Sequence, residues 1–415
     1  MLIFRGEFGR VWLLWWSAWK AGGLAEADHP TARNPKHNPC HNRRILEKIA
    51  ICPKKSPFFK PTFDKAPSFC HRPGVFDSLY PFIRAGLFRL NPEMAHEVSM
   101  RVLRLAERSG LLRLAYPEDE WAAPVTVMGL RFPNRIGLAA GLDKEANTID
   151  ALGRLGFGCI EIGTLTPRAQ AGNPRPRVFR LIEHEAIINR MGFNNRGIEA
   201  GVANVKRVKT FHGIIGINIG KNKDTPNEDA ATDYLACLRM AYPVADYIAV
   251  NLSSPNTPGL RELQSPAASA RLLETLKREQ AQLAIAHGKR VPLLFKVAPD
   301  LEEQHIRELS AVFLAGGLDG LIATNTTLDR DHVVGHPRAH EAGGLSGRPE
   351  FQKSTAVLQA FASHLDGRVP IIGVGGISSL DDARQKLRAG ASLVQVYTAF
   401  IYQGPGLIRH LAREL

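Results

Sequence analysis

Residues 251–259 form the densest group of side chains in this sequence that could take part in chemistry. They read Asn-Leu-Ser-Ser-Pro-Asn-Thr-Pro-Gly and directly follow the run 246–250, whose apolar residues predict a buried strand. The amides and hydroxyls supply hydrogen-bond donors and acceptors, and the two prolines restrict the backbone. We therefore expect a polar loop held rigidly at a strand end, as binding and catalytic loops are.

Polar or small residues follow seven further apolar runs in the same way. A turn or cap role would explain any one of these ends, because Asn, Gly and Thr are ordinary turn residues. All eight together are harder to explain as turns, and they predict one shared site. The eight ends are 139–144, 163–164, 218–221, 251–259, Lys296, 324–327, 375–376 and 397–398.

The glycines near the last two predicted strands suggest a phosphate group in the ligand. Gly375 and Gly376 follow one of these strands, and Tyr397 and Thr398 follow the other. Barrels of parallel strands commonly bind phosphate on backbone N–H groups at this position. Gly347 could add a further backbone donor.

Lysines and amides suggest the rest of the ligand. Lys144 and Lys296 could balance the charge of an anionic substrate or a reduced cofactor. No HExxH motif, His-rich cluster or pair of carboxylates occurs, which disfavours metal-dependent and glycoside hydrolysis, and no metal site is predicted. Four amides offer the paired donors and acceptors that a planar imide ring needs: Asn189, Asn251, Asn256 and Asn325.

Short apolar strands alternate with amphipathic helices from residue 134 onward. Eight strands within about 280 residues predict an α/β fold, a (β/α)8 TIM barrel. A doubly wound open sheet is the alternative, but the strand count and the lack of GxGxxG after the first strand argue against it. The predicted strands are 135–138, 159–162, 214–219, 247–250, 292–297, 321–323, 371–374 and 393–396. The predicted helices include 145–155, 197–208, 267–287, 302–315, 351–364 and 379–389.

Residues 77–115 predict a small two-helix domain ahead of the barrel, which takes 116–415. Apolar residues recur at helical spacing from 77 to 90. Asn91-Pro-Glu93 then gives a cap, a proline at the first helical position and an acid in the first turn, so a second helix begins there and ends near Gly110. The pair has more apolar surface than it can bury by itself. It either covers the barrel or lies on a membrane.

The basic character of the chain is concentrated in residues 1–74. This segment holds 13 Lys or Arg and 5 Asp or Glu, which leaves +5 of the total net charge of +13 for the rest. The remainder therefore gives no reason to expect a nucleic-acid partner. Five cysteines without CxxC spacing support neither a disulfide framework nor an iron–sulfur site, and a reducing compartment is the simplest interpretation.

The role of the extension, 1–76, has three interpretations. Its apolar run 11–19 is too short to span a bilayer, which takes about 20 residues. Flanking arginines and small residues are typical of a secretory signal, and the scarcity of acids also fits a mitochondrial presequence. The third interpretation is an artefact of the gene model, with translation starting near Val75. The composition of 20–74 predicts disorder.

From about Leu79 to its end, the chain resembles the class 2, quinone-dependent dihydroorotate dehydrogenases. Together the motifs that carry this resemblance cover every predicted strand end. They are 137–144, 161–167, 189–195, 216–223, 251–259, Lys296, 323–327 and 372–377. The resemblance implies oxidation of (S)-dihydroorotate to orotate with one FMN per chain and a membrane quinone as final acceptor, in de novo pyrimidine (UMP) biosynthesis.

The resemblance also implies roles for individual residues. FMN would be held by Ala139, Ala140, Gly141, Thr164, Asn218, Asn251, Lys296, Thr324, Gly347, Gly376, Tyr397 and Thr398. Dihydroorotate would be held by Lys144, Asn189, Arg190, Met191, Gly192, Phe193, Asn251, Asn256, Asn325 and Thr326, with the backbone contributing from Arg190 to Phe193.

Ser254 matches the catalytic base of this family. A serine needs a closed, dry site and a route for the proton, because its alkoxide is too high in energy at neutral pH. Thr257 and the ring of Phe193 are plausible parts of that route. Similar class 1 enzymes use Cys in this loop, whereas this chain has no Cys after Cys237.

The two N-terminal helices gain a purpose from the same resemblance, which implies a membrane-bound apolar tunnel leading to the flavin. His96, Arg180 and Tyr397 match polar positions at its inner end. The expected location is peripheral, on the cytoplasmic face of the bacterial inner membrane, with the mitochondrial inner membrane as the alternative. Rival functions are a flavin-dependent tRNA-modifying reductase, which typically needs a basic docking surface and a catalytic Cys, and a non-catalytic membrane-associated binding protein.

Overall fold

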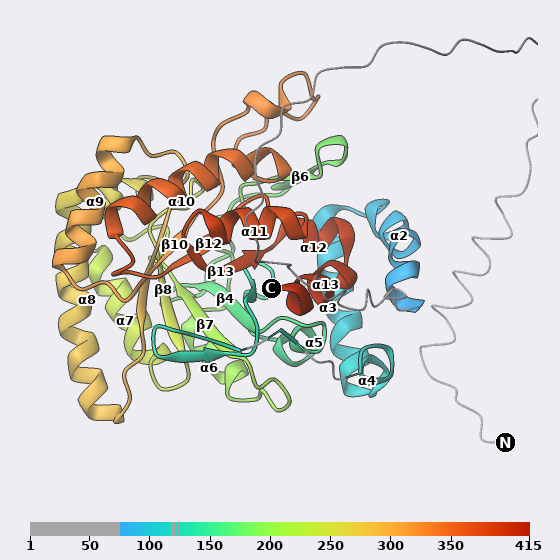
Figure 1. The fold of residues 1–415 in the computed structure, drawn as a ribbon, viewed down its shortest axis with the longest axis horizontal. Coiled ribbons are helices and arrows are strands. Elements are labelled where there is room, and N and C mark those ends of the chain that lie inside the picture. Colours follow the sequence, from blue (N-terminus) through green and yellow to red (C-terminus); the bar gives the residue numbers. More distant parts are fainter. Residues whose placement is uncertain (1–74, 118–120, 123) are drawn as a thin grey trace, which may run out of the picture. The chain divides into compact units, whose positions relative to one another are not determined.

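The computed structural model describes residues 75–117, 121–122 and 124–415, with backbone alone at Val75 and Phe76 (Figure 1). The interpretations of residues 1–74, including a targeting segment and disorder, therefore fall outside the described residues. All eight predicted barrel strands are confirmed within the described part, with bounds that differ from the prediction by zero to three residues.

Eight parallel strands close into a barrel in the order β10-β12-β13-β3-β4-β7-β8-β9. The first strand, β3, pairs with the last, β13, through the register Val394↔Ile136 to Val396↔Leu138. Pairing of β9 with β10 completes the circle. The strands are β3 (Ile136–Leu138), β4 (Cys159–Leu165), β7 (Ile214–Ile219), β8 (Tyr247–Asn251), β9 (Leu293–Val297), β10 (Gly320–Ala323), β12 (Ile371–Val374) and β13 (Ala391–Val396).

Helices follow the strands and cover the outside of the barrel (Figure 1). Their apolar faces pack on the strands in the largest buried cluster, which includes Leu273, Phe313 and Phe361. The outer helices are α5 (Ile149–Arg154), α6 (Ile198–Val205), α7 (Ala230–Ala241), α8 (Pro266–His287), α9 (Glu303–Ala315), α10 (Phe351–Leu365), α11 (Leu380–Arg388), α12 (Thr398–Gln403) and α13 (Pro405–Glu414).

A second cluster fills the barrel interior. The antiparallel hairpin of β1 (Val125–Val127) and β2 (Leu130–Phe132), which was not predicted, contributes the fully buried Phe132 to this cluster. Gly216 leaves room for Tyr247, since a Cβ atom at Gly216 would lie 2.1 Å from the Tyr247 ring. The interior is therefore a packed core, as in other barrels of this type.

Three short strands form an additional antiparallel sheet in the order β11-β6-β5, also not predicted. They are β5 (Val178–Leu181), β6 (Ala186–Asn189) and β11 (Gly344–Gly347). Their own buried cluster includes Leu181, Ile188 and Leu345. Asn189 ends β6 and Gly347 ends β11, so this sheet supplies residues of the predicted site.

The N-terminal helices are α2 (Val75–Phe88), α3 (Pro92–Arg108) and α4 (Leu111–Ala115). The predicted cap at Asn91 is confirmed, because its side-chain oxygen accepts a hydrogen bond from the Glu93 N–H at 3.0 Å. Gly110 ends the second helix as expected, with a left-handed φ of 76°, but a third short helix follows immediately.

Buried polar contacts fix these helices to the rest of the structure. Arg177 is buried, and its Nε and Nη2 both donate to Glu93 Oε1 on α3, at 3.1 and 3.0 Å. On α2, the Tyr80 hydroxyl donates to the Ile401 carbonyl at 2.8 Å and Arg84 donates to the Tyr402 carbonyl at 2.7 Å. The helices therefore hold a defined position beside the β5 strand and α12.

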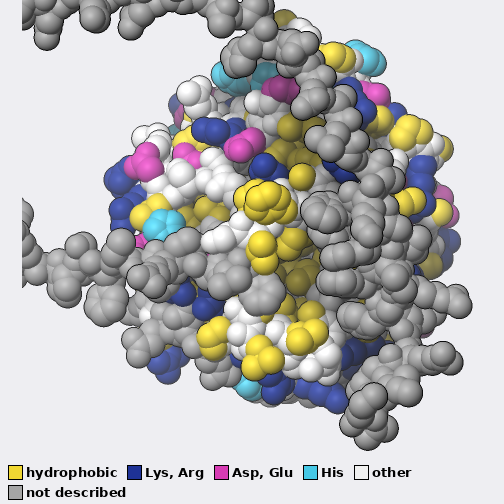
Figure 2. All heavy atoms as spheres, turned by 90° about the vertical axis from the view of Figure 1, so that its right-hand side faces the viewer, with side chains coloured by type: hydrophobic (Ala, Val, Ile, Leu, Met, Phe, Trp, Pro, Cys, Tyr) yellow, Lys and Arg dark blue, Asp and Glu magenta, His cyan; other side chains and the backbone are white. Residues whose placement is uncertain are grey.

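The outer faces of α2, α3 and α4 carry an unusual number of exposed apolar side chains. Phe82 is 73% exposed and Leu114 is 83% exposed. Figure 2 shows hydrophobic side chains gathered on the side of the molecule that carries these helices. The exposed set is Leu79, Phe82, Ile83, Met94, Val98, Val102, Leu105, Leu111 and Leu114. Among the described helices, none is both long and apolar enough to cross a membrane.

Candidate active site

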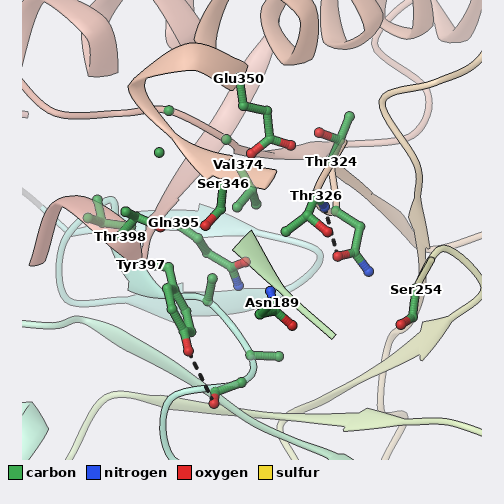
Figure 3. A pocket seen from close by; sticks show the side chains of 18 of the residues that line it. Asn189, Ser254, Thr324, Thr326, Ser346, Glu350, Val374, Gln395, Tyr397 and Thr398 are labelled. Atoms are coloured by element: carbon green, nitrogen blue, oxygen red, sulfur yellow. Dashed lines mark hydrogen bonds between the residues drawn. The ribbon is translucent and has the colours of Figure 1, made fainter. Parts of the chain in front are cut away.

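A deep cavity opens where the strands of the barrel end. It encloses about 1130 Å³ of space, part of it open to solvent, and Figure 3 shows polar side chains pointing into it from several strand ends. Its walls come from the carboxyl ends of the strands and from the β5–β6–β11 sheet. Nearly all of the predicted site residues line it: Ala139, Ala140, Gly141, Lys144, Thr164, Asn189, Met191, Gly192, Phe193, Asn251, Ser254, Asn256, Lys296, Thr324, Asn325, Thr326, Gly347, Gly376, Tyr397 and Thr398.

Glu161, buried on β4, organises one side of this cavity. Its Oε1 accepts from Asn218 Nδ2 at 2.8 Å and lies 3.4 Å from Lys296 Nζ. Its Oε2 accepts from the Tyr247 hydroxyl at 2.9 Å and from Gln395 Nε2 at 2.8 Å. A fully buried carboxylate needs such partners, because an unpaired charge in the interior is very costly. The carboxylate therefore fixes Lys296 and Gln395 where they meet the cavity.

A chain of amides continues from this carboxylate along the strand ends. Thr164 Oγ1 donates to Asn218 Oδ1 at 2.6 Å, and Asn251 Nδ2 donates to Thr164 Oγ1 at 3.1 Å. Asn325 Nδ2 in turn donates to Asn251 Oδ1 at 3.3 Å. Side chains tied to one another in this way present fixed donors and acceptors, which suits recognition of a planar polar ring.

Lys144 and a pair of amides form the opposite part of the mouth. Lys144 Nζ donates to Asn194 Oδ1 at 2.7 Å and lies 3.1 Å from Met191 Sδ. Burial, together with the nearby Arg177 guanidinium, lowers the pKa of Lys144 to about 7. Asn256 Nδ2 donates to Asn189 Oδ1 at 3.3 Å. An anion that enters here would favour the charged form of the lysine and raise its pKa.

Ser254 is nearly buried in the loop that follows β8. Its Oγ accepts a hydrogen bond from the Asn256 N–H at 3.2 Å. Thr257, three residues further along the loop, has a buried hydroxyl without a hydrogen-bond partner among the described residues. The loop thus carries three buried hydroxyl groups, those of Ser253, Ser254 and Thr257, and the Thr257 hydroxyl is free to bond to a ligand or a water.

At the glycine-rich end of the cavity, the backbone at Gly376 leaves no room for a side chain. Its φ is +74°, and an added Cβ would lie 2.5 Å from the Phe351 Cα. Gly347, with φ +98°, is similarly constrained by the Glu185 carbonyl. On the same side, the Ser346 and Thr398 hydroxyls are hydrogen-bonded at 2.8 Å. A backbone of this kind can bring N–H groups close to a phosphate.

Four predicted site residues do not line the cavity. Asn218 is buried beneath it within the Glu161 and Asn251 network, while the Arg190 side chain turns away and pairs with Glu341 at 2.7 Å. Arg180 donates to the carbonyls of Phe88 and Leu90, and its guanidinium lies 4.5 Å from the Phe88 ring centroid. His96 lies on α3, and burial lowers its pKa to about 4.

Several functional residues escaped the sequence analysis. Glu161 lies within a motif noted for its Gly and Thr residues, but its carboxylate had no recognisable partner in the sequence. The additional lining residues are Glu185, Ser346, Arg348, Glu350, Val374, Gly375, Ile377, Ser378, Gln395, Val396 and Ala399. Gly375 had been noted beside Gly376 as part of a phosphate-binding turn, whereas Gln395 inside an apolar strand was the one sequence signal available for the Glu161 network. Among the described residues, no three His, Cys, Asp or Glu side chains gather as a metal site.

The closed barrel and its polar cavity define a (β/α)8 protein with a ligand site at the carboxyl ends of its strands. A family model described as dihydroorotate dehydrogenase matches residues 122–415. The chain belongs to the dihydroorotate dehydrogenase family. Membership of this family implies a flavin cofactor.

Individual relatives support the same assignment. A protein named dihydroorotate dehydrogenase (quinone) from Akkermansia muciniphila is 61% identical over 338 residues, which cover 81% of this chain and 97% of that protein. A protein of the same name from Burkholderia thailandensis is 55% identical, covering 82% and 98%. The crystal structure of DHODH in complex with ferulenol from Eimeria tenella is similar with a TM-score of 0.73 and 38% identity, over 80% of this chain and 93% of that one.

The Glu161 network predicts a large effect for Glu161→Gln. The substitution replaces one Glu161 oxygen with an NH₂ group, which cannot accept the hydrogen bonds that Asn218 or Tyr247 donates there. Lys296 would also lose its counter-charge. We expect the free energy of unfolding to fall by about 3 kcal/mol, as when one partner of a buried ion pair is removed. Denaturant titration measures this change. The control is Glu308→Gln on the exposed surface of α9, which should change the free energy of unfolding by less than about 0.5 kcal/mol. Equal unfolding midpoints for the two variants would contradict the role of the network.

Proposed function

We propose that this protein oxidises dihydroorotate to orotate and passes the electrons to a quinone, in de novo pyrimidine (UMP) biosynthesis. The observation that carries the proposal is the meeting of Ser254, Lys144 and the amide chain in one cavity. Relatives that are 54–61% identical over more than four fifths of the chain are named dihydroorotate dehydrogenase (quinone). The reaction removes a proton and a hydride equivalent from adjacent ring carbons, so it needs a base and an electron acceptor.

The cavity fits a flavin, and we infer that this flavin is FMN. Buried polar atoms on the wall lack protein partners among the described residues, namely Thr324 Oγ1 and Gln395 Oε1. The backbone at Gly347 and Gly376 suits a terminal phosphate. The chemistry supplied by the bound flavin is acceptance of the hydride equivalent and its delivery as two electrons to quinone. The residues that hold FMN are Ala139, Ala140, Gly141, Thr164, Asn218, Asn251, Lys296, Thr324, Gly347, Gly376, Tyr397 and Thr398.

Lys296 has a defined part in this arrangement. It is buried, and its ammonium group lies 3.4 Å from the Glu161 carboxylate. A fixed cation on the cavity wall stabilises negative charge that develops on a ligand beside it, and its orientation requires no rearrangement during the reaction.

Lys144 and the amides bind the substrate. Dihydroorotate carries a carboxylate, which the Lys144 ammonium group would pair with, and ring imide groups, which match the amides of Asn251 and Asn325. Because the pKa of Lys144 is lowered to about 7, the amine takes up a proton as the anion binds at neutral or higher pH. The remaining contacts come from Asn189, Asn256, Thr326 and the segment Arg190, Met191, Gly192 and Phe193.

Ser254 Oγ takes the proton from C5 of the substrate. Its near-complete burial supplies the dry environment that a serine base needs. Thr257 lies in the same loop, and its hydroxyl has no hydrogen-bond partner among the described residues. The Phe193 ring packs against the backbone of Gly220, where an added Cβ atom would lie 3.0 Å from the ring. The Thr257 hydroxyl can pass the proton outward, while the Phe193 ring screens the site from solvent.

Quinone reaches the flavin from the side of the N-terminal helices, past His96, Arg180 and Tyr397. The lowered pKa of His96 keeps this imidazole neutral at physiological pH, so it can donate or accept a hydrogen bond without placing a charge in the path. Arg180 stacks on Phe88 at the end of α2, and Tyr397 lines the cavity. These residues link the helices to the flavin site.

The apolar faces of α2–α4 contact the membrane peripherally. Their exposed side chains extend along three successive helices, whereas large apolar patches are rare on proteins that remain in water. Contact here would bring the quinone pool next to the proposed entrance. We place the protein on the cytoplasmic face of the bacterial inner membrane. A tRNA-modifying reductase or a binding protein would not account for the family match over residues 122–415.

Anaerobic half-reactions test the function. Dihydroorotate should bleach the yellow protein, and a soluble quinone, but neither fumarate nor NAD, should restore its colour. Ser254→Ala should slow bleaching by a factor of at least 10², the usual contribution of a general base. The control is Ser363→Ala on the exposed surface of α10, which should bleach at the normal rate. Absence of bleaching in the unmodified protein would refute the activity, and recovery with fumarate or NAD would refute the quinone assignment.

His96→Ala separates the quinone path from the substrate site. We expect slower reoxidation by quinone and an unchanged rate of flavin reduction, because His96 is not a cavity-lining residue. Stopped-flow absorbance measures both rates. The exposed His332 provides the control, and His332→Ala should alter neither. Equal losses in both half-reactions of His96→Ala would exclude the proposed role.

Charges on the apolar helices should weaken membrane binding. The double variant Phe82→Glu and Leu114→Glu is expected to reduce co-flotation with phosphatidylcholine–phosphatidylglycerol vesicles several-fold, since it buries two charges at the contact. Ile285→Glu is a matched control, because Ile285 on α8 is 86% exposed but lies outside the apolar helices. Undiminished flotation of the double variant would argue against this contact surface.

A further inference from the structure

Glu350 is a buried carboxyl group on the cavity wall that has no part in the reaction described above. It ends the short 3-10 helix η4 (Arg348–Glu350) and is 2% exposed. It lines the cavity together with Thr324, Val374 and Gly375. In Figure 3 its carboxyl group points into the cavity, toward Val374 and Thr324.

One oxygen of this carboxyl group lacks a partner. Glu350 Oε1 is buried and makes no hydrogen bond within the part of the chain that the structure describes. Leaving a buried acceptor unsatisfied is costly, and such atoms in native proteins usually bind a ligand or a water. Because Glu350 lines the cavity, a ligand of the cavity is the natural partner for its carboxyl group.

The carboxyl group adjoins the glycine-rich turn after β12. A Cβ atom on Gly375 would lie 3.3 Å from Glu350 Cδ. The turn is held from behind by Lys386 on α11, whose Nζ donates to Ser354 Oγ at 2.6 Å, and Ser354 Oγ donates to the Gly375 carbonyl at 3.1 Å. Glu350 is therefore fixed between this turn and Thr324 at the end of β10.

The charge environment favours a hydroxyl group as the partner. Burial raises the pKa of Glu350 well above its usual range; Asp300 adds to this, while Lys386, Lys296 and the Thr324 hydroxyl act in the opposite direction. A protonated carboxyl group both donates and accepts hydrogen bonds, as a hydroxyl does. An ionised carboxylate beside a phosphate would instead be repelled.

We propose that Glu350 is a cofactor-binding residue whose carboxyl group hydrogen-bonds the hydroxyl groups of the flavin's polyol chain. The inference rests on the flavin of the proposed function. In FMN this chain joins the ring to the phosphate, and Glu350 adjoins both the glycine turn that suits the phosphate and Thr324 on the flavin-binding wall. Glu350 thus adds a contact for the middle of the cofactor.

Titration of the flavin-free protein with three flavins tests this contact. FMN has both the polyol and the phosphate, riboflavin lacks the phosphate, and lumiflavin lacks both. Glu350→Leu should raise the Kd for FMN and for riboflavin by roughly the same factor, about tenfold, and leave lumiflavin unchanged. Glu350→Gln keeps hydrogen-bonding capacity and should stay within about threefold of the unmodified protein. The exposed Glu303→Gln is the control and should change none of the three affinities.

The outcomes separate the alternatives. Unchanged FMN and riboflavin affinities in Glu350→Leu would overturn the inference while leaving the proposed function intact. A loss for FMN alone would assign Glu350 to the phosphate, and an equal loss for lumiflavin would assign it to packing; either would overturn the polyol contact. An infrared carboxyl band that changes when riboflavin binds, and is missing in Glu350→Gln, is expected as a second readout; its absence would count against the contact. Failure of the unmodified protein to bind any flavin would overturn the proposed function itself.

Discussion

The buried carboxylate of Glu161 is the interaction on which the arrangement of the site depends. It lies inside a closed barrel with no access to water, so its charge is tolerable only because side chains from four other strands approach it. These partners come from β7, β8, β9 and β13. One carboxylate therefore links most of the barrel's circumference and, in doing so, sets the positions of Lys296 and Asn218. The absence of a side chain at Gly216 is part of the same arrangement, since it admits the Tyr247 ring.

The repeating part of the fold could be predicted from the sequence because each barrel strand is a short, mostly apolar run with polar or small residues at its end. The helices between them were recognisable from their period. The β5–β6–β11 sheet was not, because its strands are only four residues long and β11 pairs with β6 across more than 150 positions, as Gly344 does with Asn189. The β1–β2 hairpin was missed for a similar reason: three-residue strands carry almost no periodic signal.

The residues of the candidate site also fall into a group that local sequence predicts and a group that it does not. Residues at strand ends were found because the end of a parallel strand is a defined place in this fold. Glu161, Gln395 and Glu350 were missed because their importance depends on which atoms face them across the barrel, and no local pattern records that. The first two N-terminal helices were recognisable from their apolar period, but the Glu93–Arg177 ion pair that anchors them joins residues far apart in sequence. Residues at the mouth of the barrel can thus be recognised from local sequence, whereas those beneath the mouth can be recognised only from the three-dimensional structure.

Closure of the barrel has a consequence for how the protein is made. The first strand, β3, finds one of its two neighbours only in β13, which ends at Val396 of a chain of 415 residues. The cavity walls likewise draw on Ala139, which follows the first barrel strand, and on Ala399, which lies after the last. During synthesis, the edge of β3 that faces β13 stays unpaired until β13 has been made, and such edges are prone to aggregate. The cavity is therefore complete only after β13 has joined β3, and the supply of free flavin at that moment would influence how much newly made protein matures.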